Sequence, residues 1–383
     1  MDKTRNIRIA LFSITMMLAA FGVVMIYSAS AIYADQRYGD SMYFLKRHLI
    51  SLVMGACAAF LVMLIDYRDL RRYCKWAMVP VFAGLVLVLV PQLTHQAGGA
   101  KRWFAVMGFH VQPSEFAKVA FVLFLSDYIA KSEDVNDIKR VLLPLLVVAG
   151  GMLGLILLQP DLGSTAVMGG ILLLLLFVSG LRLRFFGWLI LLAVVGFIVA
   201  VLVEPYRMRR VVSFLRPWED MQGAGFQLWQ SFLALGRGGF IGSGLGQSQQ
   251  KLFYLPAAHT DFIFSIIGEE LGFVGAGLVI VLFAAFVLCG FLVVARCPNR
   301  FGQLFSLGLV LIIAMESIIN VGVSIGAFPT KGLALPFISY GGSSMIVKMM
   351  CVGLLLNISR DASAAGPNRL FQQHSRGATV GKP

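Results

Sequence analysis

Charged residues are scarce in this 383-residue chain. Only 13% are Asp, Glu, Lys or Arg, whereas soluble domains contain about 25%. Hydrophobic residues make up 58%, and the mean hydropathy is +0.82. This composition excludes an ordinary soluble globular protein and indicates a polytopic membrane protein, a single helical bundle.

Cysteines are few, and nucleotide-binding motifs are absent. The five cysteines lie in apolar stretches or in basic loops, so no disulfide framework is expected. The chain has no Cys/His metal spacing, no HExxH and no Gly-Lys-Ser/Thr phosphate loop. We therefore expect no nucleotide cofactor.

Apolar stretches are abundant, and ten of them approach the roughly 20 residues that a bilayer-crossing helix needs. They run over 9–31, 46–65, 77–94, 112–130, 141–158, 162–180, 185–203, 262–295, 303–326 and 337–358. The predicted fold is an all-α membrane protein with ten transmembrane helices and a large, partly helical extracytoplasmic loop between the seventh and eighth. We expect one domain over residues 1–360, with the loop at 204–260, and a short disordered cytoplasmic tail at 361–383.

The distribution of Lys and Arg predicts the orientation. Ten spans put both termini on one side, where the tails and alternate loops hold 18 Lys and Arg, against 6 in the short loops opposite. By the positive-inside rule both termini are cytoplasmic. The net charge of +13 thus reflects topology and does not indicate a nucleic-acid partner.

The outer segment 204–260 departs from that rule because it carries a net charge of +3 over 57 residues. Its aromatic residues make disorder improbable, and the apolar spacing from Phe226 to Leu233 indicates a half-buried or re-entrant helix. Six glycines follow between 236 and 246. Packing or hinge roles are favoured for them over a phosphate cradle, which remains the alternative.

Ionisable residues inside apolar stretches are candidate functional groups. Glu115 and Lys118 lie three residues apart on one helical face, so they form either an ion pair or part of a site. Glu316, Asn320 and Ser324 recur every four residues, which favours hydrogen bonding between helices. Lys348 can pair with any of these carboxylates, and the sequence leaves its partner open.

Asp261 stands at the start of the longest apolar stretch. That 34-residue segment would extend about 51 Å as a helix, beyond a hydrocarbon core of about 30 Å. Counting back from Arg296 places Asp261, Glu269 and Glu270 at or above the outer interface. The residues alone support two roles for Asp261 equally, a helix cap and a catalytic group.

Several long blocks resemble one family. They are AAHTDFIFSIIGEELG (257–272), FPTKGLALPFISYGGSS (328–344), EPYRMRRVVSFLRPWED (204–220), LGRGGFIGSGLGQSQQKLFYLP (235–256), QPDLGS (159–164), and KRW with QPSEFAK (101–118). In their order along the chain these blocks resemble the SEDS family of cell-wall polymerases. The run at 329–332 is more similar to the division branch, FtsW, than to the elongation branch, RodA.

The resemblance implies a peptidoglycan glycosyltransferase that polymerises lipid II into glycan strands for septal wall synthesis. Asp261 matches the catalytic aspartate of the family, as general base in an inverting transfer that releases lipid diphosphate. A divalent cation, Mg or Mn, is implied as cofactor. The predicted substrate-binding residues are Arg102, Glu115, Lys118, Arg237, His259 and Lys331.

The resemblance also implies partners and a location. A class B penicillin-binding transpeptidase and other division proteins are the expected partners, besides lipid II and the growing strand. The expected location is the cytoplasmic (inner) membrane at the division septum. Intramembrane charges also suit a lipid II flippase or transporter, which is the alternative function.

Overall fold

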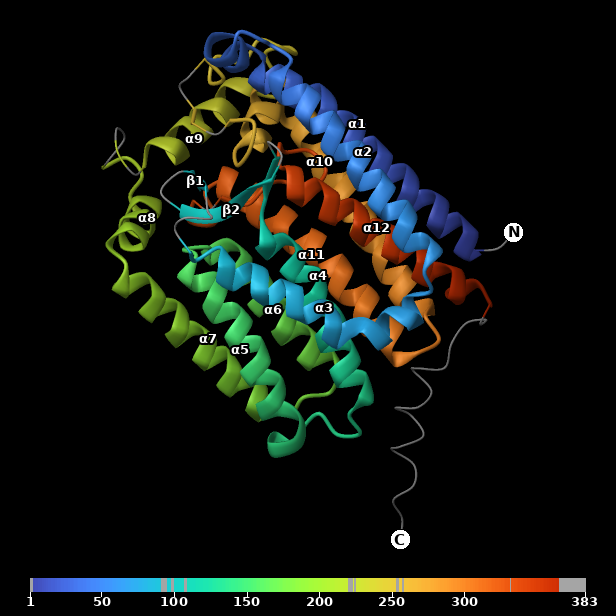
Figure 1. Ribbon diagram of the computed structural model, residues 1–383. Helices are drawn as coiled ribbons and strands as arrows, with labels where there is room; N and C mark the ends of the chain where they lie inside the picture. Colours follow the sequence, from blue (N-terminus) through green and yellow to red (C-terminus); the bar gives the residue numbers. More distant parts are fainter. Residues whose placement is uncertain are drawn as a thin grey trace.

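The computed structural model describes residues 3–90, 95–97, 100–106, 109–219, 223, 225–252, 255–256, 258–330 and 332–364. Within these ranges the chain is a helical bundle (Figure 1). The first six helices are α1 (Lys3–Tyr38), α2 (Tyr43–Leu64), α3 (Tyr67–Leu87), α4 (Pro113–Lys131), α5 (Leu143–Leu158) and α6 (Leu162–Val178). The others are α7 (Leu183–Val203), α8 (Pro205–Leu215), α9 (Phe226–Gly238), α10 (Ile263–Arg296), α11 (Arg300–Ser324) and α12 (Gly342–Ala364).

The ten predicted apolar stretches each overlap one of these helices, and α8 and α9 lie in the predicted outer loop. Seven helices of the described chain are long and apolar enough to cross a membrane, and α6 is a shorter apolar helix. α3 and α4 are more polar and are not among these seven helices. The membrane-helix class is therefore confirmed, whereas the count of ten crossings stays a prediction.

Two local predictions are wrong. The third helix begins at Tyr67, ten residues before the predicted stretch, because Asp66 caps it by accepting a hydrogen bond from the Arg68 N–H. Its first three turns are polar and were counted as a loop. The segment before α4 forms a small antiparallel sheet that was not predicted, with strand order β1 (His95–Ala97), β2 (Ala100–Val106) and β3 (Phe109–Val111).

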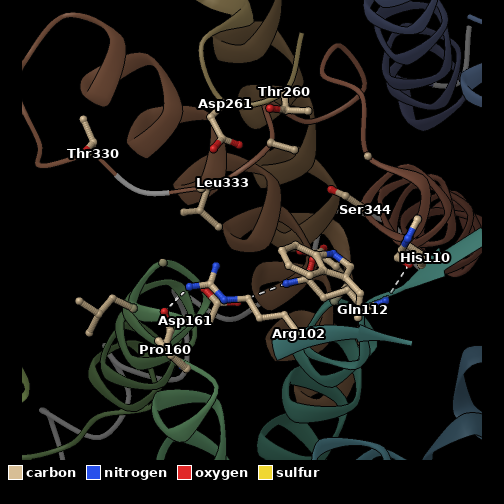
Figure 2. A pocket seen from close by; sticks show the side chains of 18 of the residues that line it. Arg102, His110, Gln112, Pro160, Asp161, Thr260, Asp261, Thr330, Leu333 and Ser344 are labelled. Atoms are coloured by element: carbon tan, nitrogen blue, oxygen red, sulfur yellow. Dashed lines mark hydrogen bonds and ion pairs between the residues drawn. The ribbon is translucent and has the colours of Figure 1, made fainter. Parts of the chain in front are cut away.

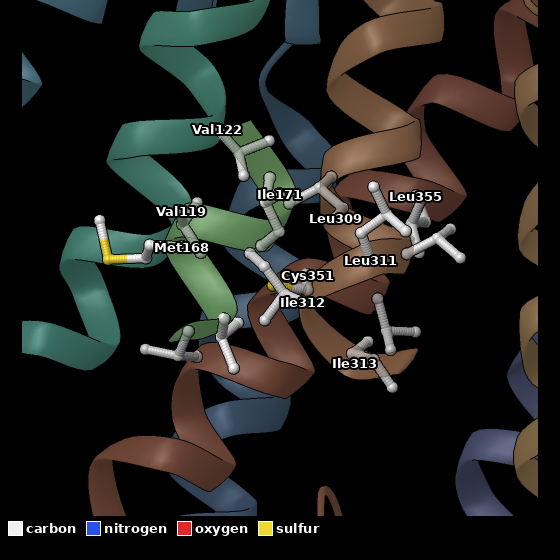
Figure 3. Packing of buried hydrophobic residues seen from close by; sticks show 14 of the residues in the cluster. Val119, Val122, Met168, Ile171, Leu309, Leu311, Ile312, Ile313, Cys351 and Leu355 are labelled. Atoms are coloured by element: carbon white, nitrogen blue, oxygen red, sulfur yellow. The ribbon is translucent and has the colours of Figure 1, made fainter. Parts of the chain in front are cut away.

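The centre of the bundle is α11, which is buried along most of its length. Figure 3 shows Val122 of α4, Ile171 of α6 and Cys351 of α12 against Leu309 and Ile312 of α11. Gly308 permits the close approach of α4, since a methyl group there would overlap the Val122 side chain. Small residues allow such tight helix packing inside membranes.

The long helix α10 contains a break that its apolar length alone does not predict. α10 has a non-helical residue at Gly272, with φ +67° and ψ −165°. The loop after α9 packs on this break: the Ser243 N–H donates to the Glu269 carbonyl at 3.0 Å and the Phe273 N–H to the Gly239 carbonyl at 2.9 Å. A side chain at Gly238 would overlap the α10 backbone. The favoured packing role is thus confirmed for Gly238, and Gly242 has equally close main-chain neighbours in α10.

The start of α1 and the end of α12 lie at the end of the bundle opposite the outer loop (Figure 1). α1 begins at the end where α12 finishes, whereas the sheet, α8 and α9 gather at the other end (Figure 1). α12 continues to Ala364, past the predicted domain boundary at 360. The predicted tail otherwise lies outside the described residues.

Candidate functional site

A cavity of about 790 Å³ opens beneath the outer loop. Its wall is assembled from β2, α4, α6, α8 and the segments 260–261, 329–330, 332–334 and 340–344, so residues distant in sequence meet there. In Figure 2, Asp261 and Thr260 face Asp161 and Pro160 across the cavity, with Arg102 between them. The charged residues that line it are Arg47, Arg102, Glu115, Asp161, Glu204, Arg207, Arg210 and Asp261.

Asp261 lies in the turn immediately before α10. The N-cap of α10 is Phe262 and no side chain caps it, so the capping role of Asp261 is wrong. Its carboxylate faces the cavity, and no described residue donates a hydrogen bond to it. Gly332 packs beside it: a Cβ at that position would be 3.2 Å from Asp261 Oδ2. The carboxylate is therefore available to a ligand.

The electrostatic surroundings of Asp261 favour its protonated form. Burial raises its pKa to about 6, although the guanidinium groups of Arg210 and Arg102 act in the opposite direction. The Asp161 carboxylate adds to the increase. A carboxyl group with a pKa near neutrality is poised to accept a proton at the pH at which the protein works.

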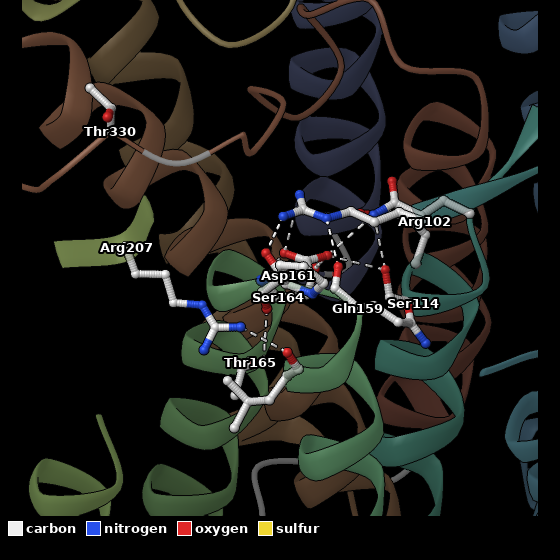
Figure 4. Close-up of polar contacts among 12 residues, drawn as sticks. Arg102, Ser114, Gln159, Asp161, Ser164, Thr165, Arg207 and Thr330 are labelled. Carbon is white, nitrogen blue, oxygen red and sulfur yellow. Dashed lines mark hydrogen bonds and ion pairs between the residues drawn. The ribbon is translucent and has the colours of Figure 1, made fainter. Parts of the chain in front are cut away.

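Arg102 and Arg210 both line the cavity and bring positive charge near Asp261. Arg102, carried by β2, donates to the Gln159 carbonyl at 3.1 Å and to the Pro160 carbonyl, and it lies 3.9 Å from Asp161 (Figure 4). Arg210, carried by α8, donates to the Thr330 carbonyl at 3.0 Å. These contacts fix both side chains at the cavity wall.

Asp161 and Arg210 were not predicted as site residues. Asp161 caps α6: its Oδ1 accepts from the Ser164 N–H at 3.1 Å and its Oδ2 from the Ser164 hydroxyl at 2.8 Å. The Asp-Leu-Gly-Ser run is a recognisable cap signal, but the pairing of a helix cap with Arg102 depends on the tertiary fold. Arg210 is one of six Lys and Arg residues in the outer segment 204–260, and its position in the sequence does not single it out.

Four buried charges form a network below the cavity. Lys118 Nζ lies 2.6 Å from Glu115 and 2.5 Å from Glu316, and Lys348 Nζ lies 2.6 Å from Glu115 and 2.9 Å from Glu316. This buried quartet joins α4, α11 and α12 and is neutral overall. Glu115 also lines the cavity, and the partners of Lys348, left open by the sequence, are both glutamates.

The other predicted binding residues lie elsewhere. Arg237 is at the exposed end of α9, donates to Gln249 Oε1 at 2.7 Å and is not among the cavity-lining residues. His259 packs in an aromatic cluster, 4.5 Å from Phe44 between ring centroids, and burial lowers its pKa to about 4. It is therefore a neutral packing residue behind the wall. Lys331 lies outside the described residues.

Glu269 and Glu270 hold the outer loop to α10. Glu269 accepts from the Ser248 hydroxyl and from the Gln249 N–H at 3.1 Å. Glu270 lies 2.9 Å from Lys251 Nζ and accepts from the Ser28 hydroxyl at 2.6 Å. Both side chains therefore tie the outer loop to α10, and Glu270 also contacts α1.

The described residues form no metal-binding site made of protein side chains alone. No group of three or more His, Cys, Asp and Glu is placed to hold a metal ion in that part of the chain. The carboxylate near Asp261 is that of Asp161. Both of its oxygens already accept hydrogen bonds from Ser164. The donor set present does not fit a divalent cation held by the protein alone, which normally needs several oxygen ligands.

Comparisons with known proteins agree with the predicted family. The family model FtsW/RodA/SpoVE, described as "Cell cycle protein", matches residues 8–364. Stage V sporulation protein E of Bacillus subtilis is 43% identical over 91% of this chain and 95% of its own. A probable peptidoglycan glycosyltransferase FtsW of Geobacter metallireducens is 43% identical over 89% of this chain and 92% of its own.

Solved structures show the same fold. A chain in a structure titled "Structural coordination of polymerization and crosslinking by a peptidoglycan synthase complex" has a TM-score of 0.76 and 29% identity, covering 92% of this chain and 97% of its own. The rod shape determining protein RodA of Thermus thermophilus has a TM-score of 0.67 and 28% identity, covering 92% and 96%.

Proposed function

The chain belongs to the FtsW, RodA and SpoVE family of cell cycle proteins, and on that premise we propose that it is a peptidoglycan glycosyltransferase that polymerises lipid II. The observation that carries the proposal is the available Asp261 carboxylate, which faces a cavity that Arg102 and Arg210 also line. Relatives at about 40% identity over most of the chain are named for the same activity.

Asp261 acts as the general base in this proposal. Glycosyl transfer requires the 4-hydroxyl of the acceptor sugar to lose a proton as its oxygen attacks the anomeric carbon of the donor. The oxygen–carbon bond forms while the bond from that carbon to the diphosphate breaks. The proton moves to Asp261, and direct attack inverts the anomeric centre, so an α-linked donor gives a β-linked strand.

Arg102 and Arg210 act on the leaving group. A lipid diphosphate departs as an anion, so it needs cations near its oxygens and no second carboxylic acid. Guanidinium groups bind phosphate oxygens through two donors at once. The implied Mg or Mn remains a separate proposal, because Mg²⁺ commonly binds substrate phosphates with few protein ligands.

The pH dependence of polymerisation follows from the pKa of Asp261. The carboxylate accepts a proton only when it is ionised, so activity is present above a pH of about 6 and is lost as the pH falls through that value. Below it, kcat/KM should fall about tenfold per pH unit. A rate profile between pH 5 and 8 with the purified protein measures this; a flat profile would remove Asp261 as the base.

Arg210→Gln tests the cation assignment. Loss of one preorganised charge at the leaving group is expected to lower kcat about 10²-fold or more. Arg237→Gln is the matched control, because Arg237 lies in the same outer loop but is not among the cavity-lining residues, and it should leave polymerisation unchanged. Initial rates with labelled lipid II measure both. Equal losses in the two variants would contradict the assignment.

Two assays on one purified sample separate this function from its alternative. A polymerase forms glycan chains from labelled lipid II, whereas a flippase moves labelled lipid II across a sealed vesicle. We expect chain formation. The cluster of Asp261, Asp161 and two arginines in one cavity favours chemistry over passage. Transport without polymer would overturn the proposal.

The cellular setting is part of the same proposal. The chain is a multi-pass membrane protein, and we place both termini in the cytoplasm and the cavity on the outer face of the inner membrane at the division septum. A class B penicillin-binding transpeptidase is the proposed partner. The support is the structural likeness to a chain from a peptidoglycan synthase complex that coordinates polymerisation and crosslinking.

A further inference from the structure

One face of α11 carries Glu316, Asn320 and Ser324, and the side chains of the first two and the main-chain carbonyl of the third contact other elements. Glu316 binds Lys118 of α4 and Lys348 of α12. Two turns later, the Ser324 carbonyl accepts from the Ser231 hydroxyl of α9 at 2.7 Å. Between them, Asn320 lies behind the cavity wall. Because α11 is the central helix, this face connects the buried quartet to the cavity.

Asn320 makes two hydrogen bonds to the cavity wall. Its side chain is 2% exposed, and its Nδ2 donates to the Asp261 carbonyl at 2.9 Å and to the Leu333 carbonyl at 2.7 Å. The reversed amide would place oxygen against two carbonyl oxygens, so the orientation of the side chain is determined by its partners. Both hydrogens of the Asn320 amide are thus used in these two hydrogen bonds.

The two carbonyl groups belong to residues that line the cavity from segments 72 positions apart in the sequence. Asp261 precedes α10 in a turn without a side-chain cap. Gly332, next to Leu333, packs against the Asp261 carboxylate, where a Cβ would approach Oδ2 to 3.2 Å. The bridge through Asn320 therefore sets where this carboxylate lies relative to the opposite wall.

We propose that Asn320 is a positioning residue for glycosyl transfer, holding the turn of Asp261 and the segment of Leu333 in the geometry in which the carboxylate meets the acceptor hydroxyl. The inference rests on the proposed function. Asn320 contacts no substrate in this role. A displacement of about 1 Å at a reacting group lowers rates about 10²-fold, so a bridge that fixes the main chain of the base has a kinetic consequence.

The test compares Asn320→Leu with Asn357→Leu. Asn357 is 7% exposed and likewise donates through Nδ2 to main-chain carbonyls, those of Val62, Met63 and Ile65. It lies fifteen residues along α12 from Gly342 at the cavity, about 22 Å away. The two asparagines are thus alike in burial and in donating to main-chain carbonyls. They differ in their distance from the cavity.

We measure kcat for polymerisation, the Kd for lipid II and the thermal unfolding of each purified variant. Asn320→Leu is expected to lower kcat about 10- to 100-fold with an unchanged Kd, whereas Asn357→Leu keeps the wild-type kcat. Asn320→Ser is a smaller change that retains one hydroxyl donor, and its kcat should fall less. It serves as the test variant if the leucine variant does not fold.

Wild-type kcat in the Asn320 variants would overturn the inference and leave the proposed function standing. Equal losses of kcat in the Asn320 and Asn357 variants, in step with their thermal unfolding, would also overturn it, since the effect would then be a general loss of stability. Failure of the wild-type protein to form glycan would overturn the proposed function and this inference with it.

Discussion

Lys348→Met is expected to lower the free energy of unfolding by about 3–5 kcal/mol. The substitution removes one of two cations from the buried quartet, in which Lys348 pairs with Glu115 at 2.6 Å and with Glu316 at 2.9 Å. Lys118 alone would then face two ionised glutamates that are 5% and 1% exposed. A buried charge without a partner loses its hydration free energy, and no ion pair or hydrogen bond compensates for that loss.

The compensating variant distinguishes charge from packing. Lys348→Met combined with Glu316→Gln leaves one neutral pair, Glu115 with Lys118. Thermal unfolding of the purified protein in detergent or nanodiscs should recover at least half of the loss. No recovery in the double variant would show that the effect of Lys348 arises from its packing, not from the balance of the four charges.

Asp261→Asn is expected to reduce glycan formation about 10²- to 10⁴-fold. An amide has nearly the shape of the carboxylate but takes no proton from the acceptor hydroxyl. The contact that holds the turn is unaffected, because Asn320 bonds the main-chain carbonyl of residue 261 and not its side chain. Initial rates with labelled lipid II measure the loss.

The controls for this variant are folding and substrate binding. Arg102 and Arg210 remain in place, so the diphosphate should bind as it does in the wild-type protein. Thermal unfolding should also stay within the wild-type range, since no described residue donates a hydrogen bond to the Asp261 carboxylate. A fall in binding equal to the fall in rate would mean that Asp261 holds substrate instead of activating it.

Some predicted features that depend on local sequence agree with the structure. The apolar stretch after Asp261 forms one helix, α10, over Ile263–Arg296. Glu115 and Lys118 are one turn apart, and they pair. The spacing along one helix determines this ion pair.

The features that were missed depend on tertiary contacts or on polar helix turns. Lys348 and Glu115 are 233 residues apart, so no spacing rule selects that pair. Arg237 and Arg210 look alike as loop cations, and only the docking of α8 on the cavity distinguishes them. The first turns of α3 are helical although they are polar, because an Asp66 cap and the packing of Tyr67 against Phe301 support them.

The central claim is that Asp261 removes the acceptor proton in a cavity that binds lipid II. The most direct measurement is glycan formation by purified Asp261→Asn in a sample whose lipid II affinity has been measured alongside the wild-type protein. We predict wild-type affinity and almost no polymer. Polymer formed at the wild-type rate would contradict the account.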